Sequence, residues 1–338
     1  SQYLLLSFAT FVYVGLLTPL MRKIAIAINA VDSPNSDRKT QKEPVPYLGG
    51  ISIAVGVLFA SYFALAYSEV TKTNLASASS VLIPAAALGV MGLIDDLKGL
   101  EPWPRLILQT IVGVIVAGIL IATDTIGTPS QVFIVDAIVT ILWIVGVCNS
   151  INFFDNLDGG AAGTVVVITF FTFLIAYDRG QLMVSALSIV TAGATAGFLI
   201  WNRPPAKIYM GDAGALFLGI IVAVLTIRLK PDIEPNWKSL SIPLFLMAVP
   251  LLDTCVAVTS RLARGISPFT GGRDHLSHRL MRKGLQRRTA AITLWSLAGV
   301  YGTIAFAIYL GQSSLLIFLA AITWAYLFIF FIRIPHSD

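Results

Sequence analysis

The feature that most constrains this chain is the recurrence of apolar stretches long enough to cross a membrane. A membrane-spanning helix needs about 20 consecutive, mostly apolar residues, and such stretches follow one another along the whole sequence. Of the 338 residues, 56% are hydrophobic and only 12% are charged, and the mean hydropathy is +0.82. These values exclude a water-soluble globular domain and a disordered chain. A single anchor or signal peptide would not account for them either.

The apolar stretches predict an all-α fold, a polytopic helical membrane bundle of about ten or eleven transmembrane helices with active-site loops at one face. We expect spans at 3–24, 47–67, 77–95, 104–123, 132–151, 161–177, 181–201, 213–229, 240–262, 290–310 and 314–332. Because the turns near 178–180 and 311–313 are short, the helix pairs that they join could be miscounted, or one helix could be re-entrant. We predict a single integral membrane domain over 1–338. Cys148 and Cys255 both lie in apolar runs, which favours neither a disulfide nor a zinc site.

The distribution of basic residues among the loops predicts the orientation. With eleven spans, 18 of the 23 Lys and Arg residues fall on one side of the membrane and 5 on the other. Because the side rich in Lys and Arg faces the cytoplasm, we expect the N-terminus outside and the C-terminus inside. The net charge of +5 is then a topology signal, and it requires no nucleic acid partner.

The acidic residues concentrate in four segments at the expected cytoplasmic ends of the spans. The segments contain Asp95 and Asp96 in GLIDDLKGL, Asn152, Asp155 and Asp158 in NSINFFDNLDGG, Asp212 in IYMGDAG, and Asp274, His275 and His278 in GGRDHLSHRL. A charge at membrane depth is costly, so this gathering of carboxylates and imidazoles at one face is typical of an active site.

Each segment also has a structural interpretation. Neighbouring helical residues point about 100° apart, so Asp95 and Asp96 should have different partners, or both could be solvated at a helix end. The spacing of three places Asn152, Asp155 and Asp158 on one side of a helical turn. Their structural alternative is a simple capping role, although one cap needs one residue and not three. Asp212 taken alone could be the N-cap of the following helix.

The acid at position 253 lies inside a predicted span, near its middle. Asp253 therefore needs a partner within the bundle. The sequence leaves open whether its role is structural or functional.

The loop at 263–289 carries a second pattern. Its apolar residues recur at helical spacing while its cations take the other face, which predicts a helix lying at the membrane surface. The apolar positions are Leu276, Leu280, Met281 and Leu285, and the basic ones are Arg279, Arg282, Lys283, Arg287 and Arg288. Beside Arg273 and Arg279, the two histidines form a donor-rich group suited to phosphate oxygens.

The residue types in the four segments indicate a metal. Carboxylate and amide oxygens, without cysteine and with few histidines, favour Mg²⁺ or Mn²⁺ over zinc. Carboxylates, a divalent cation and an Arg/His group are the parts used to move a phosphoryl-containing group.

With these motifs in order, the chain resembles the polyprenyl-phosphate N-acetylhexosamine-1-phosphate transferases, which include phospho-MurNAc-pentapeptide translocase and its GlcNAc-1-phosphate relatives. The similarity runs from 32–50 to the 273–288 loop. It implies transfer of a sugar-1-phosphate, GlcNAc-1-phosphate above all, from a UDP-sugar to undecaprenyl phosphate. The products would be undecaprenyl-diphospho-sugar and UMP. It also implies a multi-pass protein of the bacterial cytoplasmic (inner) membrane with a cytoplasmic active site, active in cell wall or polysaccharide biosynthesis, surrounded by membrane lipids and compatible with a homodimer.

The resemblance implies a role for each matching residue. Asp212 would bind Mg²⁺ with Asn152 as a second ligand, Tyr209 would stack on uracil, and Asp158 would read the base edge. Catalytic roles fall to Asp95, Asp96 and Asp155, which would orient the acceptor or take its residual proton, and to His275, while Arg273, His278 and Arg279 would contact the pyrophosphate. An aspartyl-phosphate intermediate is the less favoured route.

Several positions depart from the family pattern. Ser277 replaces the middle histidine of H-x-H-H, Asn156 a usual glycine and Gly160 a usual leucine, Lys98 lies one residue nearer the aspartate pair, and Gln41 stands where many members have histidine. PLLDT followed by SPFTGGRDHLSHRL looks like the GlcNAc-1-phosphate branch, and the donor could be another UDP-N-acetylhexosamine. The competing class is a transporter of an anionic or lipid-linked sugar, but transporters place their sites near the bilayer midplane.

Overall fold

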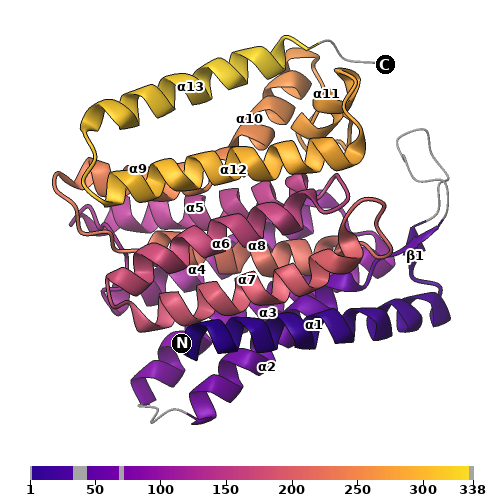
Figure 1. Ribbon diagram of the computed structural model, residues 1–338, viewed down its shortest axis with the longest axis horizontal. Coiled ribbons are helices and arrows are strands. Elements are labelled where there is room, and N and C mark those ends of the chain that lie inside the picture. The colour runs from indigo at the N-terminus through magenta and orange to yellow at the C-terminus, as the bar shows by residue number, and fades with distance from the viewer. Residues whose placement is uncertain (1, 33–43, 68–71, 335–338) are drawn as a thin grey trace.

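The computed structural model describes residues 2–32, 44–67 and 72–334. Over these residues the chain forms thirteen helices and one small sheet, in which β1 (Val31–Asp32) pairs antiparallel with β2 (Val45–Pro46). The helices are α1 (Gln2–Ala27), α2 (Gly49–Tyr67), α3 (Lys72–Lys98), α4 (Pro102–Ala122), α5 (Phe133–Phe154), α6 (Gly160–Asp178), α7 (Leu182–Asn202), α8 (Gly211–Arg228), α9 (Asn236–Leu246), α10 (Ala248–Ala263), α11 (Leu276–Arg282), α12 (Arg287–Tyr309) and α13 (Ser314–Ile332). Most run side by side, with β1 and α11 at the same end of the bundle (Figure 1).

The prediction of a polytopic helical membrane bundle is confirmed. In the part of the chain that the structure describes, ten helices are long and apolar enough to cross a membrane, and α9 with α10 makes an eleventh candidate. An odd number of spans places the chain ends at opposite ends of the bundle. In agreement, α1 begins away from β1 and α13 ends beside α11 (Figure 1).

The prediction of one continuous helix at 240–262 is wrong. The helix breaks at Met247, where α9 and α10 meet with a bend of 71°. Pro250 has no backbone N–H, so it cannot donate the helical hydrogen bond to the carbonyl of Leu246. An apolar run long enough for one span can therefore contain a broken helix.

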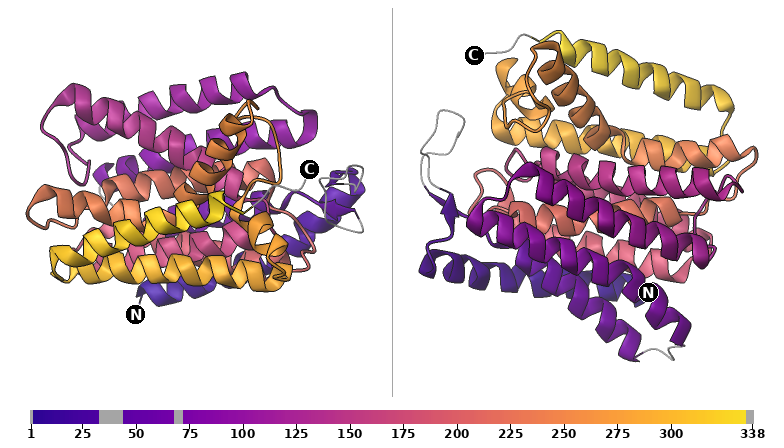
Figure 2. Two further views of the ribbon diagram at one scale, coloured as in Figure 1. Left: turned by 90° about the horizontal axis from the view of Figure 1, so that it is seen from above. Right: turned by 180° about the vertical axis from the view of Figure 1, so that it is seen from behind.

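The centre of the bundle is α8, which packs mainly against α3 and α5. In α8, 83% of the most apolar 18-residue window is buried, whereas the value is 17% in both α1 and α13. The outer helices expose large apolar side chains such as Leu16 and Ile322, which suits a lipid environment. Figure 2 shows the same arrangement from above and from behind.

The helix predicted on the 263–289 loop forms, but its faces were wrongly assigned. Between the end of α10 and the start of α12, only 276–282 is helical, and the side chain of Arg279 is completely buried. It donates hydrogen bonds to the carbonyl oxygens of Phe331 (2.6 Å) and Ile334 (2.9 Å) at the end of α13. Periodicity within the loop could not show that a helix far along the chain covers it.

Some positions singled out in the sequence lie outside the described residues. They are Gln41 and, among the basic residues counted for the orientation, Arg38, Lys39 and Lys42.

Candidate active site

A cavity of about 450 Å³ lies at the end of the bundle that carries β1 and α11. Its walls come from all four of the polar segments found in the sequence. Seven predicted site residues line it, namely Asp96, Asn152, Asp155, Asp158, Tyr209, Asp212 and His278. The fold thus brings together residues that are far apart along the chain.

Asp96 joins the end of α3 to the start of α8. Its carboxylate accepts hydrogen bonds from the backbone N–H groups of Asp212 (2.9 Å) and Ala213 (3.0 Å). The first N–H groups of a helix have no partner within the helix, so Asp96 satisfies two of them. Asp212 is the second residue of α8, whose N-cap is Met210. The interpretation of Asp212 as a simple N-cap is therefore wrong.

Two glycines make this junction possible. A Cβ atom on Gly92 of α3 would lie 2.3 Å from the carbonyl oxygen of Asp212, so only glycine lets α3 approach α8 so closely. Gly211 has a φ of +71°, and a Cβ there would lie 2.6 Å from Oδ2 of Asp96. Local backbone freedom and close packing both require glycine at this position.

Asp95 has different partners from Asp96, as the helical spacing predicts. Its buried carboxylate accepts the N–H of Leu100 (2.6 Å) and Nη1 of Arg105 (2.5 Å). The same Nη1 lies 3.1 Å from Oδ2 of Asp212. Arg105, which the sequence analysis missed, therefore bridges the aspartate pair and Asp212, while Asp95 itself does not line the cavity.

Asp212 also contacts the last turn of α5. Nδ2 of Asn152 donates to its Oδ1 at 2.8 Å, so the two predicted metal ligands are direct neighbours. Asp155 directly follows α5 and lines the same cavity. Burial, together with the negative charges of Asp96 and Asp158, raises the pKa of Asp155 to about 7.

Another part of the cavity lining combines an aromatic ring with an acid. Asp158 accepts the backbone N–H of Ala206 (3.0 Å) and lies 3.9 Å from Nη1 of Arg287. The backbone of Tyr209 is fixed by a hydrogen bond from its N–H to the carbonyl of Pro46 (2.7 Å). Burial and the charge of Asp158 raise the pKa of the Tyr209 hydroxyl, which therefore stays protonated at neutral pH.

His278 and Arg287 bring nitrogen donors to the acidic cavity. Burial and the neighbouring His275 lower the pKa of His278 to about 4, so its imidazole is neutral at pH 7 in the free protein. Arg287 was assigned to a surface face of the loop but begins α12. Tyr47 and Asn202 also line the cavity, and no sequence pattern singled them out.

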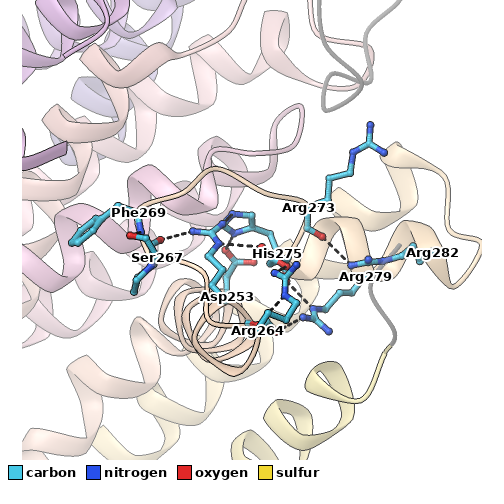
Figure 3. A network of polar contacts seen from close by, with 12 residues as sticks. Asp253, Arg264, Ser267, Phe269, Arg273, His275, Arg279 and Arg282 are labelled. Carbon is cyan, nitrogen blue, oxygen red and sulfur yellow. Dashed lines mark hydrogen bonds and ion pairs between the residues drawn. The ribbon is translucent and has the colours of Figure 1, made fainter. Parts of the chain in front are cut away.

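Besides Asp95, three predicted site residues and one further acid lie outside the cavity. Neither His275 nor Arg273 nor Arg279 lines it. His275 is buried between Asp253 and Arg261 on α10 (Figure 3). Asp274, grouped with the site acids in the sequence, instead forms ion pairs with Arg261 (3.0 Å) and Arg264 (2.5 Å).

The cavity meets the requirements of a magnesium site in part. Among the residues with described positions, no three His, Cys, Asp or Glu side chains form a metal-binding group. Mg²⁺ in phosphoryl-transfer sites often uses only one or two carboxylates, with substrate oxygens and water completing its shell. Asp212 and Asn152 provide such oxygen ligands. Burial, and then the negative charges of Asp96 and Asp158, raise the pKa of Asp155 in the same cavity, and a cation bound there would favour its ionised form.

Comparisons with known proteins agree with this geometry. Residues 78–230 match the family described as glycosyl transferase family 4. Over 327 residues, 94% of this chain and 86% of the relative, the sequence is 31% identical to a probable undecaprenyl-phosphate N-acetylglucosaminyl 1-phosphate transferase of Bacillus subtilis. The chain belongs to glycosyl transferase family 4. The resemblance to the polyprenyl-phosphate N-acetylhexosamine-1-phosphate transferases is thereby confirmed, and the protein is an enzyme of this family.

Two further relatives extend the range of similar enzymes. A decaprenyl-phosphate N-acetylglucosaminephosphotransferase of Mycobacterium leprae is 30% identical over 310 residues, which is 84% of this chain and 78% of the relative. A phospho-N-acetylmuramoyl-pentapeptide-transferase of Streptococcus agalactiae is 29% identical over 206 residues, 56% of this chain and 61% of the relative. The relatives named for N-acetylglucosamine thus match more of this family 4 chain than does the muramoyl-pentapeptide relative.

Proposed function

We propose that this enzyme transfers GlcNAc-1-phosphate from UDP-GlcNAc to undecaprenyl phosphate, giving undecaprenyl-diphospho-GlcNAc and UMP, at the cytoplasmic face of the bacterial inner membrane. The observation that carries the proposal is one cavity that combines an aromatic and acidic wall, at Tyr209 and Asp158, with the carboxylate group around Asp212. Its volume of about 450 Å³ is in the range of pockets for ligands of this size. The names of the relatives support both the sugar and the polyprenyl acceptor.

The nucleoside would bind at the wall formed by Tyr209 and Asp158. A tyrosine ring offers uracil a stacking surface, and a carboxylate can accept the N–H of the base. Arg287 and His278 would contact the pyrophosphate, because they are the arginine and the histidine that line the cavity. Arg273 and Arg279, predicted for this task, do not line it.

Mg²⁺, or Mn²⁺, would be held by Asp212 with Asn152. When bound, the cation would neutralise charge on the pyrophosphate and so favour departure of UMP. Asp96 would act on this group through the backbone, since its bonds to the N–H groups of Asp212 and Ala213 fix the first turn of α8.

The acceptor phosphate would approach from the side of Arg105. One guanidinium nitrogen of this residue already lies between Asp95 and Asp212, and Arg105 also lines a small second cavity that shares Asn152 with the large one. An acceptor oxygen would attack the β-phosphorus of UDP-GlcNAc in line. A new P–O bond forms to the acceptor, the bond from the β-phosphorus to the bridging oxygen breaks, and UMP carries that oxygen away.

A strong general base is not required for this step. A phosphate monoester has a second pKa of about 6, so the acceptor is largely a dianion at neutral pH. Asp95 and Asp96 are engaged by Arg105 and by α8, which leaves Asp155 as the cavity carboxylate best placed to take a residual proton.

The test is a transfer assay with radiolabelled UDP-GlcNAc, undecaprenyl phosphate and Mg²⁺, followed by lipid extraction and UMP measurement. We expect Asp212→Ala to abolish transfer in a protein that still folds, while Asp124→Asn, at an exposed turn, keeps wild-type activity. Full turnover by Asp212→Ala would remove Asp212 from the site. Parallel assays with UDP-GalNAc, UDP-bacillosamine-type sugars and UDP-MurNAc-pentapeptide identify the donor, and labelled sugar soluble inside vesicles would indicate a transporter instead.

A further inference from the structure

A buried polar network outside the cavity joins α10 to the loop that carries His278. Asp253 on α10 is completely buried, and both of its carboxylate oxygens are used (Figure 3). Oδ2 lies 2.7 Å from Nδ1 of His275, and Oδ1 accepts the backbone N–H of Leu276 at 2.7 Å. A buried carboxylate is tolerated only when it is fully hydrogen-bonded. These two bonds to consecutive residues fix both the position and the direction of the chain there.

The partners of His275 determine where its proton lies. Nη2 of Arg261 is 3.0 Å from Nε2 of His275, and a guanidinium can only donate. Nε2 must therefore accept, so the ring proton is on Nδ1 and is donated to Asp253. Both ring nitrogens are occupied in a site where only 6% of His275 is exposed. His275 could not bind substrate or transfer a proton without breaking this network.

The residues on either side are held in the same way. Asp274 pairs with Arg261 and Arg264, and Ser277 donates a hydrogen bond to Oδ1 of Asn156. Arg279 is bound to the end of α13. Within 274–279, the residue that lines the cavity is His278.

We propose that Asp253 is a positioning residue: through His275 and the N–H of Leu276 it holds α11 in the register that presents His278 to the cavity. His275 belongs to this support and is not a catalytic residue. Asp253 thereby acquires the partner that its place inside a span requires, and its role is to orient a substrate-binding group. The activity readout of this inference rests on the proposed transfer reaction.

The first test is a double-mutant cycle on transfer activity. Asp253→Asn keeps the shape of the side chain, but its amide can accept only one of the two hydrogen bonds, so its own NH₂ must face either the Nδ1–H of His275 or the N–H of Leu276. We expect it to lower kcat/KM about 10- to 100-fold, the usual effect of losing a supporting hydrogen bond. In a His278→Ala background the same change should cost less than about threefold, because the two residues act as one unit. Equal losses in both backgrounds would overturn the proposal.

The second test separates positioning from catalysis at His275. Glutamine can both donate to Asp253 and accept from Arg261, so His275→Gln should retain transfer within about tenfold of wild type, whereas His275→Ala should lose about as much as Asp253→Asn. Loss of transfer in His275→Gln as complete as in Asp212→Ala would identify a catalytic imidazole instead. This pair of variants also decides the question if Asp253→Asn does not fold.

The third measurement does not depend on activity. Hydrogen exchange followed by mass spectrometry should show faster exchange over 273–283 in Asp253→Asn, with the central helix α8 unchanged. Thr254→Val is the matched control, since its hydroxyl donates only within α10, to the carbonyl of Pro250. Unchanged exchange over 273–283 would overturn the positioning role. If exchange over 273–283 becomes faster in Asp253→Asn but the wild-type enzyme shows no transfer with any of the donors, the positioning role stands and the proposed function fails.

Discussion

The carboxylate of Asp96 accepts the backbone N–H of Asp212 at 2.9 Å, and that of the next residue, Ala213, at 3.0 Å. An acid from the end of α3 therefore sets the position of the acid that opens α8. The bond links two of the four polar segments and makes the geometry around Asp212 depend on the packing of α3 against α8.

Asp96→Asn should impair both stability and transfer. The amide can accept only one of the two N–H groups, and its own NH₂ would face the other. We expect a loss of about 0.5–2 kcal/mol of stability, as for the loss of a helix cap, and transfer at least about tenfold slower as Asp212 shifts. Thermal unfolding in detergent and the transfer assay measure the two effects.

The matched control for Asp96 is Asp136→Asn. This acid also accepts a backbone N–H, that of Ser130, but it lies in the first turn of α5, whereas the cavity residue Asn152 lies in the last turn. It should leave transfer unchanged. An equal loss of transfer in both variants would show that the effect is not specific to the junction of α3 and α8.

Gly92→Val should separate α3 from α8. In the present backbone the valine Cβ would lie 2.3 Å from the carbonyl oxygen of Asp212. The two helices must therefore move apart, which also separates Asp96 from Asp212. We expect a loss of about 1–3 kcal/mol from overpacking, together with loss of transfer. Gly118→Ala is the control, because a Cβ there meets nothing within 4 Å, and it should stabilise the helix by about 0.5–1 kcal/mol. A fully active Gly92→Val enzyme would contradict the close-contact requirement.

Because of Asp155, we expect the stability of the folded protein to depend on pH in buffer without divalent cations. Its pKa is raised to about 7 in the folded protein, so between the ordinary carboxyl range and pH 7 the folded state binds more protons than the unfolded state. Stability from this residue therefore falls as the pH rises from about 4 to about 7. Asp155→Asn removes the effect.

The measurement for Asp155 is the difference in Tm between Asp155→Asn and wild type. It should increase in favour of the variant from pH 5 to pH 8. A difference that is constant over this range would mean that the carboxyl titrates normally. Addition of Mg²⁺ should reduce the advantage of the variant at pH 8, because a cation stabilises the ionised acids.

Arg105→Met should affect the acceptor more than the donor. The variant leaves the buried carboxylate of Asp95 without its ion-pair partner and removes the cation nearest to Asp212 on the side of the second cavity. We expect KM for undecaprenyl phosphate to rise at least about tenfold, as for loss of a charged hydrogen bond, with a smaller change in KM for UDP-GlcNAc. Lys98→Met, which removes an exposed cation near the same helix end, should leave both values unchanged. A rise confined to the KM of UDP-GlcNAc would place Arg105 at the donor instead.

Much of the site could be predicted from the sequence, because acids cost free energy in an apolar chain and so stand out where they gather. Asp96, Asn152, Asp155, Asp158 and Asp212 are all at the cavity. The basic loop was harder to interpret. Its cations looked equivalent in sequence, yet Arg287 lines the cavity whereas Arg279 is buried against the end of α13.

The sequence by itself determined that the chain is a helical membrane bundle, where nearly every span lies, and which segments carry chemistry. Each of these follows from hydropathy and from the cost of placing charge in an apolar medium, which are properties of local sequence. Only the tertiary structure decided which polar groups meet. That Asp96 binds the first turn of α8, that Arg105 bridges Asp95 and Asp212, and that Asp253 supports His275 depend on contacts between helices far apart in the chain. Such contacts follow from glycine-mediated packing and a proline-broken helix, and neither is visible in hydropathy.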